Sequence, residues 1–239
     1  MTPSASGPSG AAAFAEIARA LLAEDNVQQT LQKIVDLAVE TIHGCDCAGI
    51  SLLRGKKVDT PASSSEVPVK VDAIQYETGE GPCLDAIREH EIFVTGDLCR
   101  EARWPNFASR AQHETGVTSM LSFRLFVEGE TLGALNLYSQ SADAFDDSSR
   151  TVGLVFAAHA AVALSSALHD EQMGEALESR DVIGQAKGIL MAREGVSADE
   201  AFDMLRRASQ RLNMKLRDLA GEMVHSTEPA PDEPTGASP

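Results

Sequence analysis

Apolar residues recur at three- and four-residue steps between Val182 and Val224, a spacing that predicts three short helices. Gly195 is expected to end the first helix, and Ser197 with Glu200 forms a capping box that starts the second. Asn213 is expected to cap the third helix. The side chains predicted to face inward are Ile183, Ala186 and Leu190 in a first helix over 181–194, then Phe202, Leu205 and Leu212, then Leu216, Leu219 and Met223.

The chain from Phe14 to about Leu168 mixes helical and strand-like patterns. A short polar connection, Glu128–Glu130, separates two apolar runs and predicts a β-hairpin. Helices around such strands indicate an α+β fold with an antiparallel sheet. The expected strands are Cys47–Leu53, a weak strand or loop up to Pro68, Ile92–Val94, Met120–Val127 and Thr131–Tyr138. Four helices are expected. The first carries Phe14, Ile17, Leu21 and Leu22, and the second follows a cap at Asp25 or Asn26 and faces inward with Leu31, Ile34, Val35, Ala38 and Ile42. The other two are Val69–Tyr76 and Pro105–Thr115.

The stretch from Asp146 to Glu178 almost lacks glycine and proline and predicts one long helix. Its first half is expected to pack on its own sheet. The apolar spacing is also compatible with pairing between two copies of the helix, although the seam is rich in Ala, Ser and His. Gly174 is a candidate hinge. The seam positions are Val152, Val155, His159, Val162, Ser166, Met173 and Leu177.

Composition indicates a cytoplasmic protein without a membrane span. The chain has 239 residues, a net charge of −16 and four cysteines, which we expect to be reduced thiols because no export signal is visible. No apolar run reaches the length of a membrane span. Residues 1–12 are expected to form a flexible leader, and the acidic, proline-rich residues 226–239 a disordered tail.

Charge separates the C-terminal stretch from the rest. Between Arg180 and Leu219 there are eight basic and six acidic residues, so this segment is +2 and the remainder is −18. Arg207, Arg211 and Lys215 share a face if the second helix continues past Asn213, and still cluster if it breaks there. A basic patch in an acidic chain is typical of a site for a phosphate backbone.

The same stretch resembles the ANTAR domain, a three-helix RNA-binding output module of bacterial transcription antiterminators. The matching residues are Ala186–Met191, Ala201-Phe202, Leu205-Arg206, Ser209-Gln210, Asn213, Lys215-Leu216 and Asp218–Ala220. The resemblance implies that two ANTAR copies of a homodimer hold paired stem-loops in a nascent leader transcript, so that a terminator hairpin does not form. The candidate RNA-binding residues are Lys187, Arg206, Arg207, Ser209, Gln210, Arg211, Asn213, Lys215 and Arg217.

The preceding region resembles a GAF domain, a small-molecule sensor fold. The matching residues are Gly79–Leu84, Val94–Leu98, Arg103–Pro105 with Phe107, Gly116-Val117 with Ser119, and Gly133–Tyr138. The resemblance implies five or six antiparallel strands, helices packed on one side, and a pocket on the other for a small-molecule ligand of unknown identity. We therefore expect a GAF-like domain at 13–168, a helical linker at 169–179 and an ANTAR-like bundle at 180–225.

Other chemistries are open but less favoured. Gly79–Pro82 is either an anion cradle or, as we prefer, a turn into a helix that starts at Pro82. Cys83 lies where a helix dipole lowers a thiol pKa, which suits a redox sensor, yet a lone cysteine is more often a small hydrophobe. Cys83 and Cys99 are also the candidate pair for methionine sulfoxide reduction. Together with Cys45 and Cys47 they could form a four-thiolate metal site only if the fold brings all four cysteines together.

No catalytic residue, metal site or cofactor is identified, because no paired nucleophile and base, HExxH, P-loop or kinase signature is present. We therefore do not expect an enzyme. A DNA-binding regulator is the third alternative, but the second turn of the three-helix module lacks the glycine of a helix-turn-helix.

Overall fold

The computed structural model describes residues 10–89 and 92–226. The chain forms two compact units, with the boundary between His169 and Asp170. The predictions for residues 1–9 of the leader and 227–239 of the tail lie outside the described residues. Residues 10–12, predicted as leader, belong instead to the first helix, α1 (Gly10–Leu22).

The sheet of the first unit is antiparallel, with the order β2-β1-β5-β4-β3 in the described residues. Glu128 and Gly129 both adopt positive φ, 47° and 87°, which gives the hairpin before β5 the twist that its strands need. The predicted strands and hairpins are therefore confirmed, including the weak second strand. The bounds are β1 (Cys47–Arg54), β2 (Lys57–Ser63), β3 (Phe93–Thr95), β4 (Ser119–Val127) and β5 (Glu130–Ser139).

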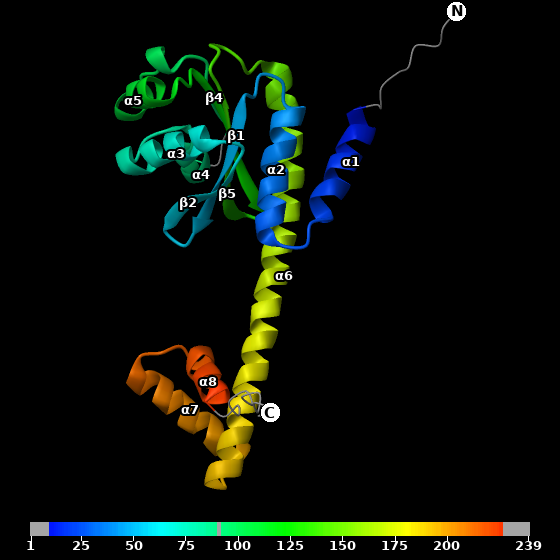
Figure 1. Ribbon diagram of the computed structural model, residues 1–239. Helices are drawn as coiled ribbons and strands as arrows, with labels where there is room; N and C mark the ends of the chain where they lie inside the picture. The colour runs from blue at the N-terminus through cyan, green and yellow to red at the C-terminus, as the bar shows by residue number, and fades with distance from the viewer. Residues whose placement is uncertain (1–9, 90–91, 227–239) are drawn as a thin grey trace, which may run out of the picture. The chain divides into compact units, whose positions relative to one another are not determined.

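Helices cover both faces of this sheet (Figure 1). One face packs against α2 (Val27–Thr41) and α6 (Asp147–Glu194), with α1 outside them. The other carries α3 (Glu66–Thr78), α4 (Pro82–Glu89), α5 (Pro105–Thr115) and the 3₁₀ turn η1 (Leu98–Arg100). The expectation of helices on one side only was wrong, because both faces of β1, β4 and β5 are apolar enough to bury.

Local rules account for most helix boundaries. Asn26 caps α2 by accepting from the Gln29 amide at 2.9 Å. Gly79 ends α3 at a φ of 70°, and α4 starts at Pro82, so the turn interpretation of Gly79–Pro82 is confirmed. In the predicted amphipathic helix α1, Leu21 is buried whereas Leu22 is 59% exposed. The predicted face of α2 is buried as expected: Leu31, Ile34, Val35, Ala38 and Ile42.

Helix α6 is continuous over 48 residues, and this corrects two predictions. It includes Gly174, so no hinge is visible there, and it includes the segment expected to be a separate helix from Asp181. Its N-terminal half buries small and apolar side chains against the sheet, as predicted: Phe156, Ala157, Ala160, Ala161, Ala163 and Leu164.

The length and hydropathy of α6 also correct the statement that no segment suits a membrane span. Within the described residues it contains an 18-residue window of mean hydropathy 1.8. The helix is long and apolar enough to cross a membrane by length and composition only, and the core helix of a soluble protein also meets these two criteria. Because one side of the helix packs into the core of the first unit, that packing accounts for its apolar character.

The second unit packs the end of α6 against α7 (Ala198–Leu212) and α8 (Leu216–His225). The capping box is confirmed: the Ser197 amide donates to Glu200 at 2.8 Å, and the Glu200 amide donates to the Ser197 hydroxyl at 3.3 Å. Gly195 ends α6 as expected, with φ of 68°. The fully buried side chains are small apart from two leucines: Ala186, Leu190, Ala201, Leu205 and Ala220.

Four residues of this bundle depart from their predicted roles. Phe202 is 38% exposed and Leu212 is 53% exposed, because Ala186, Ala201 and Ala220 bring the helices close together and leave no space for a large ring. Leu219 is only half-buried beside the buried Ala220. Asn213 ends α7 in the left-handed conformation, φ 52°, and Lys215 takes the cap position of α8.

Candidate nucleic-acid interface

Most basic side chains of the second unit have no carboxylate partner among the described residues. Arg206 pairs with Asp203 at 2.9 Å, and Arg217 lies 3.4 Å from Asp218. The other six basic residues between 180 and 217 have no carboxylate within 4.0 Å in the described part of the chain: Arg180, Lys187, Arg193, Arg207, Arg211 and Lys215. These six are available to an external anion without first breaking an ion pair.

The candidate cations do not form one face. Arg207 and Arg211 lie four residues apart and share one flank of α7, as predicted. At about 100° per residue, Arg211 is on the side of α7 opposite to Phe202, nine residues earlier. Asn213 breaks the helix, so Lys215 belongs to the start of α8 and not to a third step along α7.

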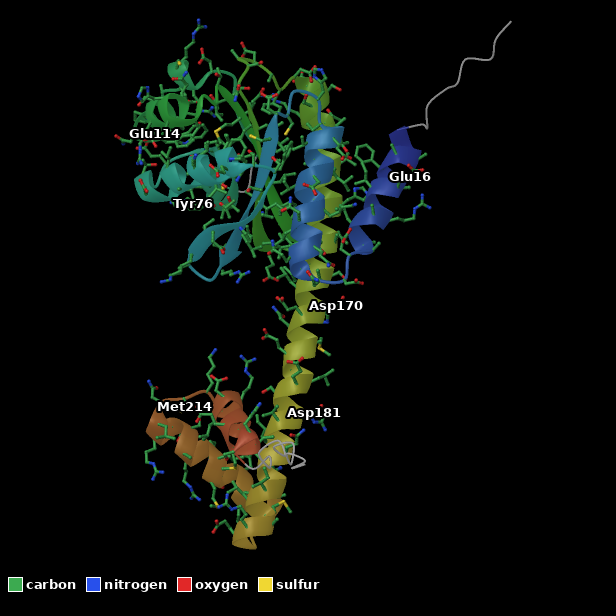
Figure 2. The ribbon with its side chains drawn as sticks, viewed as in Figure 1. Glu16, Tyr76, Glu114, Asp170, Asp181 and Met214 are labelled. Carbon is green, nitrogen blue, oxygen red and sulfur yellow. The ribbon has the colours of Figure 1, made fainter. Side chains whose placement is uncertain are left out.

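Two of the candidate residues shape the turn between α7 and α8. The Ser209 hydroxyl donates to the carbonyl of Met214 at 2.6 Å, and Met214 is labelled in this turn in Figure 2. Asn213 supplies the positive φ. Gln210 is exposed on α7, and its carbonyl accepts from the Asn213 amide at 3.3 Å. The structure places Arg180 and Phe202, which were not among the predicted RNA-binding residues, beside Lys187 at one hollow of the second unit.

Inside the first unit, a buried polar network lies on the sheet face that carries α3 and α4. Asp72 of α3, fully buried, accepts from the Thr60 hydroxyl at 2.8 Å, from Gln75 at 2.9 Å and from Tyr138. Burial raises its pKa to about 6, against the lowering effect of these hydrogen bonds. Tyr76, labelled on α3 in Figure 2, donates to Ser51, which in turn donates to Asp72.

Three of the four cysteines, Cys45, Cys47 and Cys83, have thiol pKa values raised by burial. Cys83 is buried and donates to Ser51 at 3.0 Å, and burial raises its pKa to about 12, opposite to the lowering expected from the helix dipole. Burial also raises the pKa of Cys45 to about 12 and of Cys47 to about 11. Cys99 is exposed. Over the described ranges, no three metal-ligating side chains come together.

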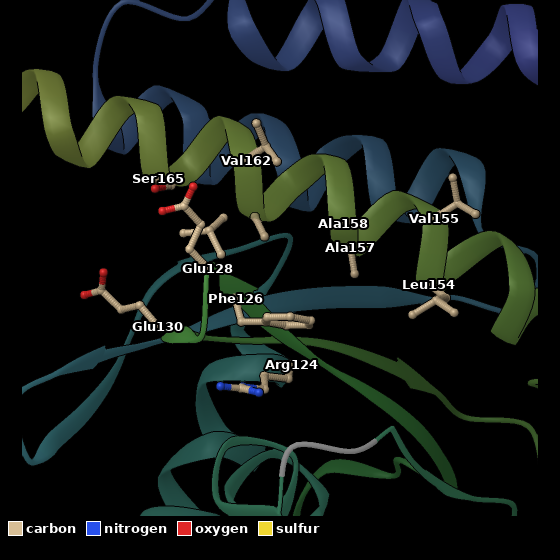
Figure 3. Close-up of a pocket in the computed structure, with 12 residues that line it drawn as sticks. Arg124, Phe126, Glu128, Glu130, Leu154, Val155, Ala157, Ala158, Val162 and Ser165 are labelled. Atoms are coloured by element: carbon tan, nitrogen blue, oxygen red, sulfur yellow. The ribbon is translucent and has the colours of Figure 1, made fainter.

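A groove of about 990 Å³ lies elsewhere on the first unit, between the β4–β5 hairpin and α6 (Figure 3). Phe126 is 50% exposed in it, and the Arg124 guanidinium lies 4.6 Å from the centre of its ring. The α6 wall presents Leu154, Val155 and Val162, all exposed. The residues that line this groove are mainly apolar, and α6 forms one of its walls.

Family comparisons agree with these two units. The GAF domain model matches residues 24–165, and the ANTAR domain model matches residues 171–224. The chain belongs to the GAF domain family and carries an ANTAR domain after it. This GAF–ANTAR architecture is that of an RNA-binding regulator with a sensor domain.

Solved structures support the fold of the GAF domain. The free methionine-R-sulfoxide reductase of Neisseria meningitidis is 16% identical, with a TM-score of 0.53 over 71% of this chain and 98% of that one. The GAF domain of an Acinetobacter phosphoenolpyruvate-protein phosphotransferase is 13% identical, with a TM-score of 0.52 over 68% and 96%. The corresponding Coxiella burnetii domain is 17% identical, with a TM-score of 0.51 over 69% and 99%. Among curated proteins, none matches the sequence.

Proposed function

We propose that this GAF–ANTAR protein is a cytoplasmic transcription antitermination regulator that binds stem-loops in nascent leader RNA. The observation that carries the proposal is the ANTAR domain with its unpaired cations, Arg207 and Arg211 above all. Cations supply backbone attraction, and hairpin loops expose unstacked bases for contact. The acidic remainder of the chain disfavours coating of nucleic acid by the whole protein and limits binding to this local site.

Two copies of the chain would act together through α6. Val155 and Val162 on this helix are exposed, and Val162 lies at the edge of the groove beside Phe126. Met173 and Leu177 are exposed further along the same helix. Pairing of two such helices would make binding of a second hairpin intramolecular, which raises affinity about 10²–10⁴-fold without new contacts.

We propose that the GAF domain is a sensor and not an enzyme. Reduction of methionine sulfoxide, named for some proteins of the same fold, would need a reactive thiolate. Cys83 is buried with a raised pKa, which disfavours that role. Absence of thiol-dependent turnover by the purified protein would agree with a sensor, whereas turnover lost in Cys83→Ser would overturn the assignment.

RNA binding is tested with a triple variant, Arg207→Ala with Arg211→Ala and Lys215→Ala. Its affinity for RNA hairpins recovered from cells with the wild-type protein should fall, and the slope of log K against log salt should decrease by roughly 0.7–0.9 for each lost phosphate contact. The matched control removes three exposed cations from the β1–β2 hairpin, Arg54, Lys56 and Lys57, so that net charge changes equally.

Unchanged hairpin affinity in the first triple variant, with helicity retained, would contradict the assignment of these residues. Equal loss in both variants would indicate a general effect of net charge. Tighter binding of duplex DNA than of RNA hairpins would favour the DNA-binding alternative.

A further inference from the structure

Phe202 is exposed beside a hollow of the second unit that is lined by α6 and α7. The hollow measures about 470 Å³, within the range of about 300–1,000 Å³ for small-molecule sites. The ring has 38% of its surface exposed, and the Lys187 ammonium lies 5.8 Å from its centre. The hollow is lined by Ala176, Ser179, Arg180, Ile183, Gly184 and Lys187 of α6 and by Phe202 of α7.

The charges at this hollow favour an anion. Arg180 and Lys187 line it, seven residues apart, which places them on one side of α6 about 10 Å apart along the axis. In the described residues neither makes an ion pair, and no carboxylate is among the lining side chains. Asp181, labelled in Figure 2, follows Arg180 but does not line the hollow. In a chain of net charge −16 this is a local positive site.

The space between the cations is open. A methyl group placed on Gly184 would meet no atom within 4 Å, so no side chain or backbone closes the hollow there. Phe202 lines the same hollow and has 38% of its surface exposed, so part of its side chain is accessible to a group that enters. Base–aromatic stacking needs this combination of an exposed ring and nearby cations for the adjoining phosphates.

We propose that this hollow binds one unpaired RNA base, stacked on Phe202, while Arg180 and Lys187 contact the phosphates beside it. The inference rests on the proposed RNA binding and adds a position for a loop nucleotide. Bases in a stem are already stacked and paired. Only an unpaired loop nucleotide whose base is unstacked from its neighbours can therefore enter the hollow. A second copy of the chain is the competing occupant, but an apolar protein surface would leave both cations without partners.

The test compares full-length Phe202→Leu with Phe202→Tyr. The probe is a pool of RNA hairpins with one constant stem and a randomised loop, from which the wild-type protein selects its binders. Leucine retains apolar contact but lacks an aromatic face, so affinity for the selected hairpin should fall roughly 5- to 140-fold, the equivalent of losing one stacked base. Tyrosine keeps that face and should bind like the wild type.

Phe126→Leu is the matched control, because Phe126 is also an exposed ring beneath a cation but lies in the GAF domain. It should leave hairpin affinity unchanged. An abasic nucleotide at the stacked loop position should weaken binding to the wild type and add no further loss in Phe202→Leu. A 2-aminopurine at that position should lose fluorescence on binding to the wild type but not to Phe202→Leu.

The outcomes separate the two proposals. If the wild type selects hairpins and Phe202→Leu binds them equally well, the base site is wrong while RNA binding stands. If the wild type selects none, both are wrong. If Phe202→Leu lowers the oligomeric state in sedimentation, and the abasic nucleotide has no effect, the hollow is an interface between copies. The abasic result with wild-type protein decides the question even if the leucine variant does not fold.

Discussion

Replacement of Asp72 by Asn should remove a pH dependence that the buried network imposes on the GAF domain. Among the described residues no cation pairs with Asp72: its hydrogen-bond donors are the hydroxyls of Thr60, Ser51 and Tyr138 and the side-chain amides of Gln75 and Asn136. Burial therefore dominates and raises its pKa from 3.8 to about 6. The neighbouring Tyr76, Tyr138 and Cys83 have pKa values raised far above this range and stay neutral.

The sign of the effect follows from linkage. The folded state binds the Asp72 proton more tightly than the unfolded state, so its contribution to stability is present below about pH 4 and is lost as the pH rises through about 6. A difference of about two pKa units corresponds to about 3 kcal/mol, at 1.36 kcal/mol per unit. Asn does not titrate, so the variant should lack this loss.

Urea unfolding, monitored by tryptophan fluorescence, reports on the stability of the GAF domain. Trp104 is the single tryptophan of the chain and is buried in the GAF domain, where its indole donates to Asp85 at 2.6 Å. The quantity to plot is the unfolding free energy of the wild type minus that of Asp72→Asn, from about pH 4 to about pH 8. Carboxylates with lowered pKa, such as Glu101 beside Arg103, have the opposite pH dependence and cancel in this difference.

The difference should decrease by about 3 kcal/mol across this range. A constant offset between the two proteins is expected, because Asn accepts fewer of the hydrogen bonds, and it does not bear on the argument. A difference that is flat, or that increases with pH, would show that Asp72 is not a buried group with a raised pKa.

Four further changes test other parts of the structure. Val155→Asp with Val162→Asp should lower dimer content in sedimentation and affinity for a two-hairpin RNA, but not for a single hairpin; equal loss for both RNAs would exclude α6 as the coupling element. A thiol reagent should modify one cysteine quickly in the folded protein, Cys99, and all four only after unfolding; rapid modification of a buried thiol would contradict their raised pKa values. Ser197→Ala should destabilise the ANTAR bundle by about 1 kcal/mol, measured by thermal unfolding followed by the loss of helicity. Unchanged stability would show that the capping box does not stabilise the bundle. Gly133→Ala should destabilise the GAF domain by roughly 1–3 kcal/mol or more, because the new methyl would lie 1.9 Å from the Ser51 carbonyl oxygen; wild-type stability would contradict the tight β1–β5 pairing.

Boundaries set by neighbouring residues were predictable. The Asn26 cap, the Glu128–Glu130 hairpin, the Gly195 stop and the Ser197 capping box each depend on hydrogen bonds or φ values within a few residues. The resemblance to GAF and ANTAR domains likewise followed from residues close together in sequence, and both families are confirmed.

Candidate contact residues were predictable only as a set. Composition placed the cations of the second unit in one short segment, but not their partners. The structure pairs Arg206 with Asp203, whereas Arg207 makes no ion pair within the described residues, although the two arginines are adjacent. Periodicity could not separate them, because Asp203 lies one turn before both, three residues before Arg206 and four before Arg207.

The sequence by itself determined several caps and turns, the α+β class and the acidic chain with a local basic segment, but not the start of α1 or the continuity of α6. Only the tertiary structure decided which face each element buries. Phe202 and Leu205 both fit an apolar stripe, yet the close approach of helices at Ala186, Ala201 and Ala220 buries the leucine and exposes the ring. Cys83 likewise stands at a helix start that lowers a thiol pKa, but strands and helices distant in sequence bury it and raise that pKa instead. Burial is a property of the assembled fold, and local spacing carries no information about what packs on the other side.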